Sequence, residues 1–548
     1  MFGQLPTMGL ALLALAKITS AASADEWTGK AIYQVMTDRF AVTDGSDPDC
    51  DLFKYCGGTW QGIINKLDYI QGMGFSAIQI SPVVQNFEND TDYGEAFHGY
   101  WPINNYAVNA NFGSADDLKA LSKALHDRDM YLMVDVVIND MATPINGPMT
   151  TKTIIDYSQF VPFNDAKYFH PYCNITNYEN TTNAQECWLG ADIVALPDLD
   201  TESDEVADLT HTWIKELIAN YSIDGLRIDA AKHVPDAFLA SFVQNAEVFT
   251  FGEIYSGVLD DVCRYQEFMD GLPNYLTYFP LIQAFTAGNM KGLAKMVGDV
   301  ASDCQDIFYM GSFAENHDLP RFASLNNDLA LAKNAIAFTI LADGIPTMYQ
   351  GQEQHATGNY SPNNRAPLWG YGYDAEAPLY NITATFNKIR SHAISIDSRY
   401  TTNTTQELYL DDSTYATRKG PEGNQVVAVY SNQGTAGGEY ELVIPGAFAV
   451  GTEVTELVNC TTATANEAGN ITALMAGGQP RVFYPTFNLN GSGLCGTSET
   501  ATTTNSSGTT TDTSPSATST KKSMGEHVHI QVPIVVSYVL FASALLLL

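Results

Sequence analysis

The sequence has few basic residues. Only 27 Lys and Arg stand against 62 Asp and Glu in 548 residues, so the formal net charge is −35, and charged residues of both signs make up only 16% of the chain. A surface this acidic repels nucleic-acid phosphates, so we expect no nucleic-acid partner. The composition suits a neutral ligand or an acidic medium.

The chain also lacks cysteine pairs with the two-residue spacing of zinc ligands. Its eight cysteines could form disulfides in about 105 ways. We prefer nearest-neighbour pairing, because each disulfide then closes a loop within one segment, and we rank a zinc site below it. The predicted pairs are Cys50–Cys56, Cys173–Cys187, Cys263–Cys304 and Cys460–Cys495. Together with many Asn-x-Ser/Thr sequons, they indicate a secreted glycoprotein.

Two long apolar runs lie at the ends of the chain. Residues 1–24 combine an apolar stretch with small residues at their end, which is typical of a secretory signal peptide. Residues 497–529 are mostly Ser, Thr and other polar or small residues, and 530–548 are apolar. This order predicts a Ser/Thr-rich stalk and a GPI-attachment signal, with a transmembrane helix as the alternative. We therefore expect a cell-surface protein that contacts the membrane only through a lipid anchor. Transfer from this anchor to the cell wall is the alternative location.

No glycine-rich nucleotide loop follows the first predicted strand, which disfavours a doubly wound sheet. Instead, strand-like and helical segments alternate from residue 31 to about 395, and this predicts a parallel (β/α)8 barrel. The predicted strands are 32–40, 77–84, 131–138, 225–229, 248–254, 307–313 and 345–349. The predicted helices include 63–73, 116–127 with Ser114 as N-cap, 206–221 and 331–341.

Two regions do not follow the alternation. Residues 141–205 carry one cysteine pair and several sequons, and we interpret them as a small domain inserted after the third strand, between barrel segments 25–140 and 206–399. Residues 400–496 contain β-prone runs separated by glycine-rich turns. They predict a C-terminal antiparallel β-sandwich domain.

Three carboxylates follow three different predicted strands. Asp229 lies two residues after Arg227, so both side chains share one face of a strand, and the guanidinium is expected to keep Asp229 ionised as a nucleophile. Glu253 has no adjacent cation in the sequence and suits a general acid/base with a raised pKa. Asp318, beside His317, could stabilise positive charge on a sugar ring. A barrel brings all three to one mouth, which predicts glycoside hydrolysis.

The chain resembles fungal α-amylases of the α-amylase superfamily, glycoside hydrolase family 13. The likeness runs from about Trp27 to Cys495, and four motifs occur in the family's order. They are Asp135-Val136-Val137-Ile138-Asn139-Asp140, Gly225 to His233, Phe251-Gly252-Glu253 and Phe313-Ala314-Glu315-Asn316-His317-Asp318. The resemblance implies endo-acting, retaining cleavage of α-1,4-glucosidic bonds in starch- or glycogen-type glucans by a monomer.

The resemblance also implies the residues that bind substrate and metal. The residues expected to contact the glucan are His98, Tyr100, Trp101, Asp140, Arg227, Lys232, His233, His317 and Arg365. A calcium ion is expected between the barrel and the inserted domain. Its ligands would be Asn139, Asp198 and the main-chain carbonyls of Gln185 and His233.

One departure concerns the first motif, which ends in Asn139-Asp140 where the family carries Asn-His. The family histidine donates a hydrogen bond to the sugar, whereas an ionised Asp140 can only accept one. Ser361 similarly replaces an acidic residue near Arg365. These changes leave open a transferase that moves glucan segments to another glucan. A non-catalytic glucan-binding wall protein would require a lost carboxylate, and none is lost. An α-glucosidase or isomaltase is disfavoured by the matching inserted domain and cysteine pairs.

Overall fold

The computed structural model describes residues 23–145, 147–190 and 192–498. The predicted signal peptide and Ser/Thr-rich stalk lie outside this part apart from two residues each, and the apolar tail lies wholly outside it, so these three assignments stay predictions. Within the described residues, no helix has both the length and the apolar character needed to cross a membrane.

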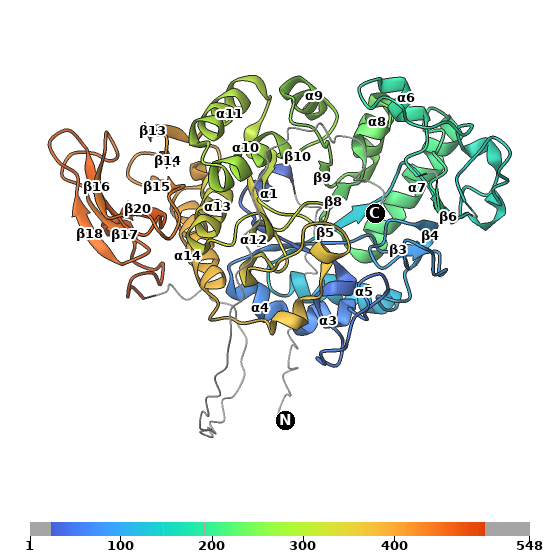
Figure 1. Cartoon of the computed structure of the whole chain (residues 1–548), viewed down its shortest axis with the longest axis horizontal. Coiled ribbons are helices and arrows are strands. Elements are labelled where there is room, and N and C mark those ends of the chain that lie inside the picture. The colour runs from blue at the N-terminus through green and yellow to red at the C-terminus, as the bar shows by residue number, and fades with distance from the viewer. Residues whose placement is uncertain (1–22, 146, 191, 499–548) are drawn as a thin grey trace, which may run out of the picture.

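Eight parallel strands form a barrel at the centre of the molecule (Figure 1). Their order is β10-β11-β12-β1-β2-β5-β8-β9, and a bridge from Phe251 to Gly271 brings β9 beside β10 and closes the sheet. This confirms the predicted (β/α)8 fold. The strands are β1 (Ile32–Val35), β2 (Ala77–Ile80), β5 (Tyr131–Val136), β8 (Gly225–Ile228), β9 (Phe249–Gly252), β10 (Leu272–Pro273), β11 (Met310–Ser312) and β12 (Ile345–Tyr349).

One end of the barrel is closed by Trp27, which is fully buried and stacks on Phe249 with 5.2 Å between ring centroids. A Cβ at Gly225 would lie 2.7 Å from the Trp27 ring, which explains why β8 begins with glycine. The polar residues that follow the strands therefore gather at the opposite, carboxyl end, where barrels carry their sites.

Helices surround the barrel. They are α1 (Ala24–Thr28), α2 (Thr37–Phe40), α3 (Trp60–Asn65), α4 (Leu67–Gly72), α5 (Ala115–His126), α7 (Asp204–Tyr221), α8 (Asp236–Ala246), α9 (Leu259–Cys263), α10 (Tyr275–Thr286), α11 (Met290–Asp303), α12 (Phe322–Leu325), α13 (Leu329–Leu341) and α14 (Pro378–Ile396). Ser114 caps α5 as predicted, since its side chain accepts a hydrogen bond from the amide of Asp117.

Four predicted elements differ from the structure. The strand expected over 77–84 ends at Ile80, two residues before Pro82, and Val84 begins the separate strand β3 (Val84–Asn86). The strand expected over 32–40 ends at Val35, and residues 37–40 form α2, because the buried Asp38 carboxylate accepts backbone hydrogen bonds from Cys56 and Gly57. The helix expected over 63–73 is two short helices, α3 and α4. The strand expected over 307–313 is a 3₁₀ turn followed by the three-residue β11. Strand β10 was missed because it has only two residues.

Between β5 and α7 the chain forms an inserted segment on one side of the barrel (Figure 1). It contains α6 (Thr181–Glu186) and an antiparallel pair, β6 (Thr143–Pro144) with β7 (Val194–Ala195), around an apolar cluster of its own that includes Phe160 and Trp188. The hairpin β3 (Val84–Asn86) and β4 (Pro102–Val108) lies beside it, since Asn104 bridges to Val161.

The C-terminal strands are antiparallel, as predicted. Six of them form one sheet in the order β13-β14-β15-β20-β17-β18, and β16 pairs with β19. One apolar cluster includes Val427 and Phe483 of the large sheet and Leu442 and Ile471 of the small one. The strands are β13 (Gln406–Leu410), β14 (Thr414–Lys419), β15 (Val426–Ser431), β16 (Tyr440–Ile444), β17 (Glu453–Glu456), β18 (Thr461–Thr464), β19 (Ile471–Met475) and β20 (Arg481–Pro485).

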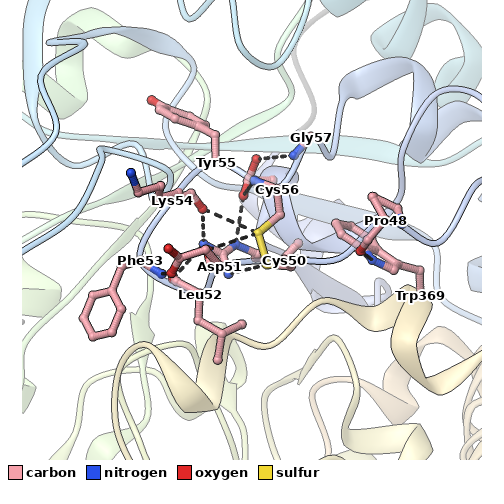
Figure 2. Close-up of a disulfide and its surroundings, with 12 residues drawn as sticks. Pro48, Cys50, Asp51, Leu52, Phe53, Lys54, Tyr55, Cys56, Gly57 and Trp369 are labelled. Atoms are coloured by element: carbon pink, nitrogen blue, oxygen red, sulfur yellow. Dashed lines mark hydrogen bonds and ion pairs between the residues drawn. A yellow bond between two sulfur atoms is a disulfide. The ribbon is translucent and has the colours of Figure 1, made fainter.

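All eight cysteines form the four predicted disulfides, so the zinc alternative is wrong. Figure 2 shows the Cys50–Cys56 loop. Buried Arg39 fixes this loop, because its Nη2 donates to the carbonyls of Leu52 at 2.9 Å and Lys54 at 2.7 Å. The loop is thus held rigidly against the barrel.

Candidate active site

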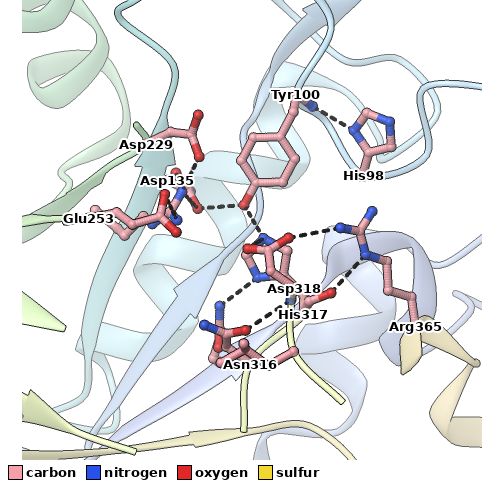
Figure 3. Close-up of polar contacts among 12 residues, drawn as sticks. His98, Tyr100, Asp135, Asp229, Glu253, Asn316, His317, Asp318 and Arg365 are labelled. Carbon is pink, nitrogen blue, oxygen red and sulfur yellow. Dashed lines mark hydrogen bonds and ion pairs between the residues drawn. The ribbon is translucent and has the colours of Figure 1, made fainter. Parts of the chain in front are cut away.

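The three predicted catalytic carboxylates lie around one cleft at the carboxyl end of the barrel (Figure 3). Asp229 directly follows β8, Glu253 directly follows the neighbouring β9, and Asp318 lies in the loop after β11. Nine of the predicted site residues line this cleft, and they are His98, Tyr100, Trp101, Asp140, Asp229, Glu253, His317, Asp318 and Arg365.

Arg227 holds a cluster of carboxylates beneath the cleft. Its Nη1 lies 2.5 Å from Asp229 Oδ1 and 3.0 Å from both oxygens of Asp135, and its Nη2 lies 2.7 Å from Glu253 Oε2. The expectation that Glu253 has no adjacent cation is therefore wrong, because the guanidinium reaches both β8 and β9. One buried fork orients both carboxyl groups that the reaction requires.

The titration of this cluster differs from the expectation for Asp229. Burial raises the pKa of Asp229 to about 8, with further raising by Glu253 and Asp135, and these effects outweigh the lowering by Arg227. Because three carboxyl groups share one guanidinium, the cluster retains a proton near neutral pH. Acid catalysis requires that proton on one carboxyl while its neighbour is ionised.

Asp318 is held from two sides. Arg365 Nη2 donates to its Oδ1 at 2.9 Å, and His317 Nε2 lies 3.1 Å from its Oδ2. The same arginine donates from Nε to the His317 carbonyl at 2.9 Å, so Arg365 contacts both the side chain of Asp318 and the backbone of the loop that carries it. These contacts fix the position of the Asp318 carboxyl group beside Asp229 and Glu253 in the same cleft (Figure 3).

Aromatic residues from the loop before β4 form another wall. The Tyr100 hydroxyl donates to Asp135 Oδ2 at 2.7 Å, and its ring is nearly parallel to that of His317. His98 Nδ1 accepts a hydrogen bond from the Tyr100 amide at 3.0 Å and packs edge-on against Trp101. Flat aromatic surfaces beside paired carboxylates suit a sugar ring.

Lys232 and His233 do not line the cleft. Lys232 lies in a neighbouring hollow with Tyr178 and Arg264. His233 is buried, and its Nδ1 lies 2.8 Å from the Ala184 carbonyl of α6. His233 thus lies where the barrel meets the inserted segment, next to the residues predicted to bind calcium.

The predicted calcium ligands fit a cation of this type. Asn139 and Asp198 are both almost fully buried, and each has a buried polar side-chain atom without a hydrogen-bond partner, namely the Asn139 amide nitrogen and Asp198 Oδ1. Because an amide's nitrogen and oxygen can be exchanged by rotation, Asn139 can offer its oxygen instead. Gln185 uses its side chain elsewhere, donating to the Val234 carbonyl at 3.0 Å. Its predicted contribution is the main-chain carbonyl alone.

A second group of candidate metal ligands lies beside this site. The ligand atoms of His170, Asp200 and Glu202 lie within 4.8 Å of one another. His170 also connects to the predicted calcium site, because its Nδ1 lies 2.7 Å from Asp198 Oδ2. Sequence reasoning missed this cluster, since nothing in the spacing of the three residues marks it.

Comparisons with known proteins decide the family. The α-amylase catalytic-domain model matches residues 34–409, and the α-amylase domain C model matches residues 407–503. The chain belongs to the α-amylase family. It is 46% identical over 482 residues to alpha-amylase 2 of Schwanniomyces occidentalis, covering 87% of this chain and 94% of that one. It is 44% identical over 468 residues to the alpha-amylase of Saccharomycopsis fibuligera, covering 84% and 92%.

The fold comparison agrees with this assignment. The solved structure of an alpha-amylase from Malbranchea cinnamomea matches this chain with a TM-score of 0.83 and 47% sequence identity. The match covers 86% of this chain and 100% of the Malbranchea cinnamomea chain. The fold of most of the chain therefore has a counterpart in a solved α-amylase.

Asp140 is the main departure of this α-amylase from the family motif. It lines the cleft, is 4% exposed, and its Oδ2 has no hydrogen-bond partner. Burial raises the pKa of Asp140 well above its usual value, with further raising by Asp229 and Asp198. These effects push the Asp140 carboxyl toward its neutral form, which can donate, whereas a cation bound at neighbouring Asn139 and Asp198 would push it back toward the ionised acceptor expected from the sequence.

Sequence reasoning also missed two residues of this α-amylase site. Asp135 lies within the first motif, and it is the shared partner of Arg227 and Tyr100. Tyr255, two residues after Glu253, is 45% exposed and packs edge-on against Tyr275 with 5.0 Å between ring centroids. An aromatic residue so close after an acid/base candidate was the available signal.

Proposed function

We propose that this chain cleaves α-1,4-glucosidic bonds within starch- or glycogen-type glucans by retaining double displacement. The observation that supports this most is the Arg227 fork, which holds Asp229 through Nη1 and Glu253 through Nη2. Two carboxyl groups on one guanidinium lie close together, and retaining enzymes need this short separation because no water enters between the groups in the first step. The relatives named alpha-amylases support the same choice.

We assign the roles by the likeness of the motifs that carry these groups to those of α-amylases. Asp229 attacks the anomeric carbon, and Glu253 donates its proton to the departing glycosidic oxygen. Glu253 then accepts a proton from the water or hydroxyl that releases the sugar from Asp229. Asp318, His317 and the Tyr100 ring surround the sugar while positive charge develops on it. Arg227 keeps Asp229 directed at the cleft during both steps.

A second candidate is transfer of glucan segments to another glucan. The observation in its favour is Tyr255, whose exposed ring follows Glu253 and is fixed by Tyr275 and Phe279. Such a ring could stack on an acceptor sugar and exclude the competing water. Product analysis on maltooligosaccharides separates the two candidates: hydrolysis gives shorter products only, whereas transfer also gives longer ones.

The first prediction concerns the balance between these reactions. Histidine carries its donor nitrogen further from the backbone than the Asp140 carboxyl does, so Asp140→His should add a hydrogen bond to the bound sugar. A neutral hydrogen bond contributes about 0.5–1.5 kcal/mol, so cleavage should speed up by roughly two- to tenfold. The ratio of short to long products should rise.

Asp140→Asn is the matched control, because asparagine has the size and neutrality of a protonated aspartic acid. It should behave like the unaltered chain. If Asp140→His changes neither the rate nor the products, position 140 does not set the balance. If Asp140→Asn alone reproduces the effect of histidine, charge at this position is responsible rather than the reach of the donor.

We further propose that calcium joins the inserted segment to the barrel. Asn139 and Asp198 would hold the ion through side-chain oxygens, and Gln185 and His233 through main-chain carbonyls. The unpartnered buried atoms of Asn139 and Asp198 support this. Bound there, the ion supplies structural stability, since its ligands come from both parts of the chain.

The second prediction tests this site. Asp198→Ala should lower the melting temperature and abolish the further fall seen on adding a chelator to the unaltered chain. Loss of a ligand present at 100 times its dissociation constant costs about 2.7 kcal/mol, so the effect should be several degrees. Glu205→Ala, an exposed partner of Lys167 beside the inserted segment, is the control. An undiminished chelator response in Asp198→Ala would contradict the assignment.

A further inference from the structure

The barrel core directly beneath the cleft is polar. Gln34 on β1, Gln79 on β2 and Thr347 on β12 are all buried there, and they line a cavity of about 30 Å³ together with Arg227 and His317. Most side chains of these three strands are apolar and buried, so a buried amide at position 34 requires an explanation. Burying an amide is costly unless it is hydrogen-bonded.

The partner of Gln34 is a residue of the active site. Its Nε2 lies 3.0 Å from His317 Nδ1. On the other side of the ring, His317 Nε2 lies 2.9 Å from the Tyr100 hydroxyl oxygen and 3.1 Å from Asp318 Oδ2. Gln34, His317 and Tyr100 thus form one chain of hydrogen bonds that runs from the barrel core to the cleft.

The direction of each hydrogen bond in this chain can be assigned. The Tyr100 hydroxyl oxygen lies 2.7 Å from Asp135 Oδ2, which also accepts from Arg227 Nη1 at 3.0 Å. Burial raises the pKa of Asp135 to about 6 against the lowering by Arg227, so the carboxyl is ionised at neutral pH and the Tyr100 hydroxyl donates to it. The Tyr100 oxygen must then accept from His317 Nε2, and Asp318 Oδ2 is an acceptor as well. Two acceptors at Nε2 place a proton on this nitrogen.

The other ring nitrogen follows from this. Burial lowers the pKa of His317 well below its usual value, with further lowering by Arg365 and Arg227, so the ring is neutral. A neutral imidazole protonated at Nε2 has a lone pair at Nδ1, which accepts from the amide nitrogen of Gln34. Every hydrogen bond in the chain is satisfied by this arrangement.

We propose that Gln34 is a positioning residue that fixes His317 in the neutral tautomer protonated at Nε2. This keeps the Nε2–H on the cleft side of the ring, where the Tyr100 oxygen and Asp318 Oδ2 share it and are held in place beside the bound sugar. The catalytic role of Gln34 rests on the proposed glucan cleavage. The tautomer of His317 rests only on the hydrogen bonds described above. Gln34 acts from the barrel core and does not itself reach the substrate.

The test combines a spectroscopic and a kinetic measurement on the full chain. ¹⁵N-histidine NMR, with the His317 signal identified by its loss in His317→Asn, should show Nε2 protonated and Nδ1 unprotonated in the unaltered protein. In Gln34→Leu, both neutral tautomers of His317, protonated at Nε2 or at Nδ1, should be populated. On maltooligosaccharides kcat should fall about three- to tenfold, the worth of one hydrogen bond, while KM changes little.

Gln34→Glu gives the opposite perturbation. A carboxylate beside Nδ1 draws a proton to that nitrogen and favours the imidazolium, so a new ionisation should appear in the pH–rate profile. Gln79→Leu is the control, because it removes a buried amide from the same cavity without touching His317, and its His317 signal should stay as in the unaltered chain.

Two results would overturn the proposal: a His317 protonated at Nδ1 in the unaltered protein, or a Gln34→Leu variant with unchanged tautomer and unchanged kcat. If the NMR result holds but the protein cleaves no glucan, the proposed function fails while the tautomer assignment stands. The two failures are therefore distinguishable.

Discussion

Replacing Asp229 by Ala should abolish glucan cleavage, with a loss of about 10⁴-fold or more in kcat. In the proposed mechanism the covalent intermediate cannot form without this carboxylate, and a nucleophile's removal has effects of this size because no other group takes over its role. Glu253→Ala should be nearly as severe for substrates with a poor leaving group. It should be much milder for a glycosyl fluoride, whose leaving group needs no proton.

Azide rescue distinguishes the two roles. With α-maltosyl fluoride and azide, the Asp229→Ala variant should give a β-configured glycosyl azide, because azide enters the vacated space and displaces fluoride in one inversion. The Glu253→Ala variant should give the α-configured azide after two inversions through the Asp229 ester. If the configurations are exchanged, the assigned roles are exchanged as well.

A matched control lies at the other end of the same strand. Asp224 directly precedes β8, and its carboxylate accepts hydrogen bonds from the Leu132 amide at 2.8 Å and contacts His126. Asp224→Asn should lower stability modestly and leave the chemistry intact. A loss of activity in this variant comparable to that of Asp229→Ala would mean that any damage to β8 disables the protein, and the role of Asp229 would then need other evidence.

The barrel could be predicted because its strands are buried on both faces and therefore form apolar runs that end in polar residues. The prediction was weakest where this pattern is short. β10 has two residues, too few for any periodic signal. Residues 37–40 form only one helical turn, too short for a periodic signal in the sequence, and the tertiary contacts of Asp38 with the Cys56–Gly57 backbone hold that turn in place.

The site was predicted in its composition but not in its charge balance. The sequence places Arg227 two residues from Asp229, so their contact was foreseen. That the same guanidinium also reaches Asp135 on β5 and Glu253 on β9 depends on strand neighbours and register, which the spacing of residues does not contain. The raised pKa values of Asp229 and Asp140 likewise follow from burial and from carboxyl groups that only the fold brings close.

Arg227→Lys should be the most damaging conservative substitution in the protein. One ammonium cannot replace a planar fork that contacts three carboxylates from three strands. Leaving a buried charge without its partner costs about 3–5 kcal/mol, so the melting temperature should fall markedly. Without the fork, Asp229 and Glu253 are less well oriented for the reaction. If the activation free energy rises by only part of that amount, kcat should fall by roughly 10²–10³-fold.

The pH dependence gives this prediction a definite sign. The guanidinium lowers the pKa of Asp229 against the raising effects of burial, Glu253 and Asp135. Weakening that contact raises the pKa of Asp229 further, and since the nucleophile must be ionised, the acidic limb of the pH–rate profile should move to higher pH. Arg128→Lys, which alters an exposed pair with Asp68, should leave both the melting temperature and the profile unchanged. A profile in Arg227→Lys that moves to lower pH, or stays in place while kcat falls, would show that Arg227 acts only through folding and not on the charge of the nucleophile.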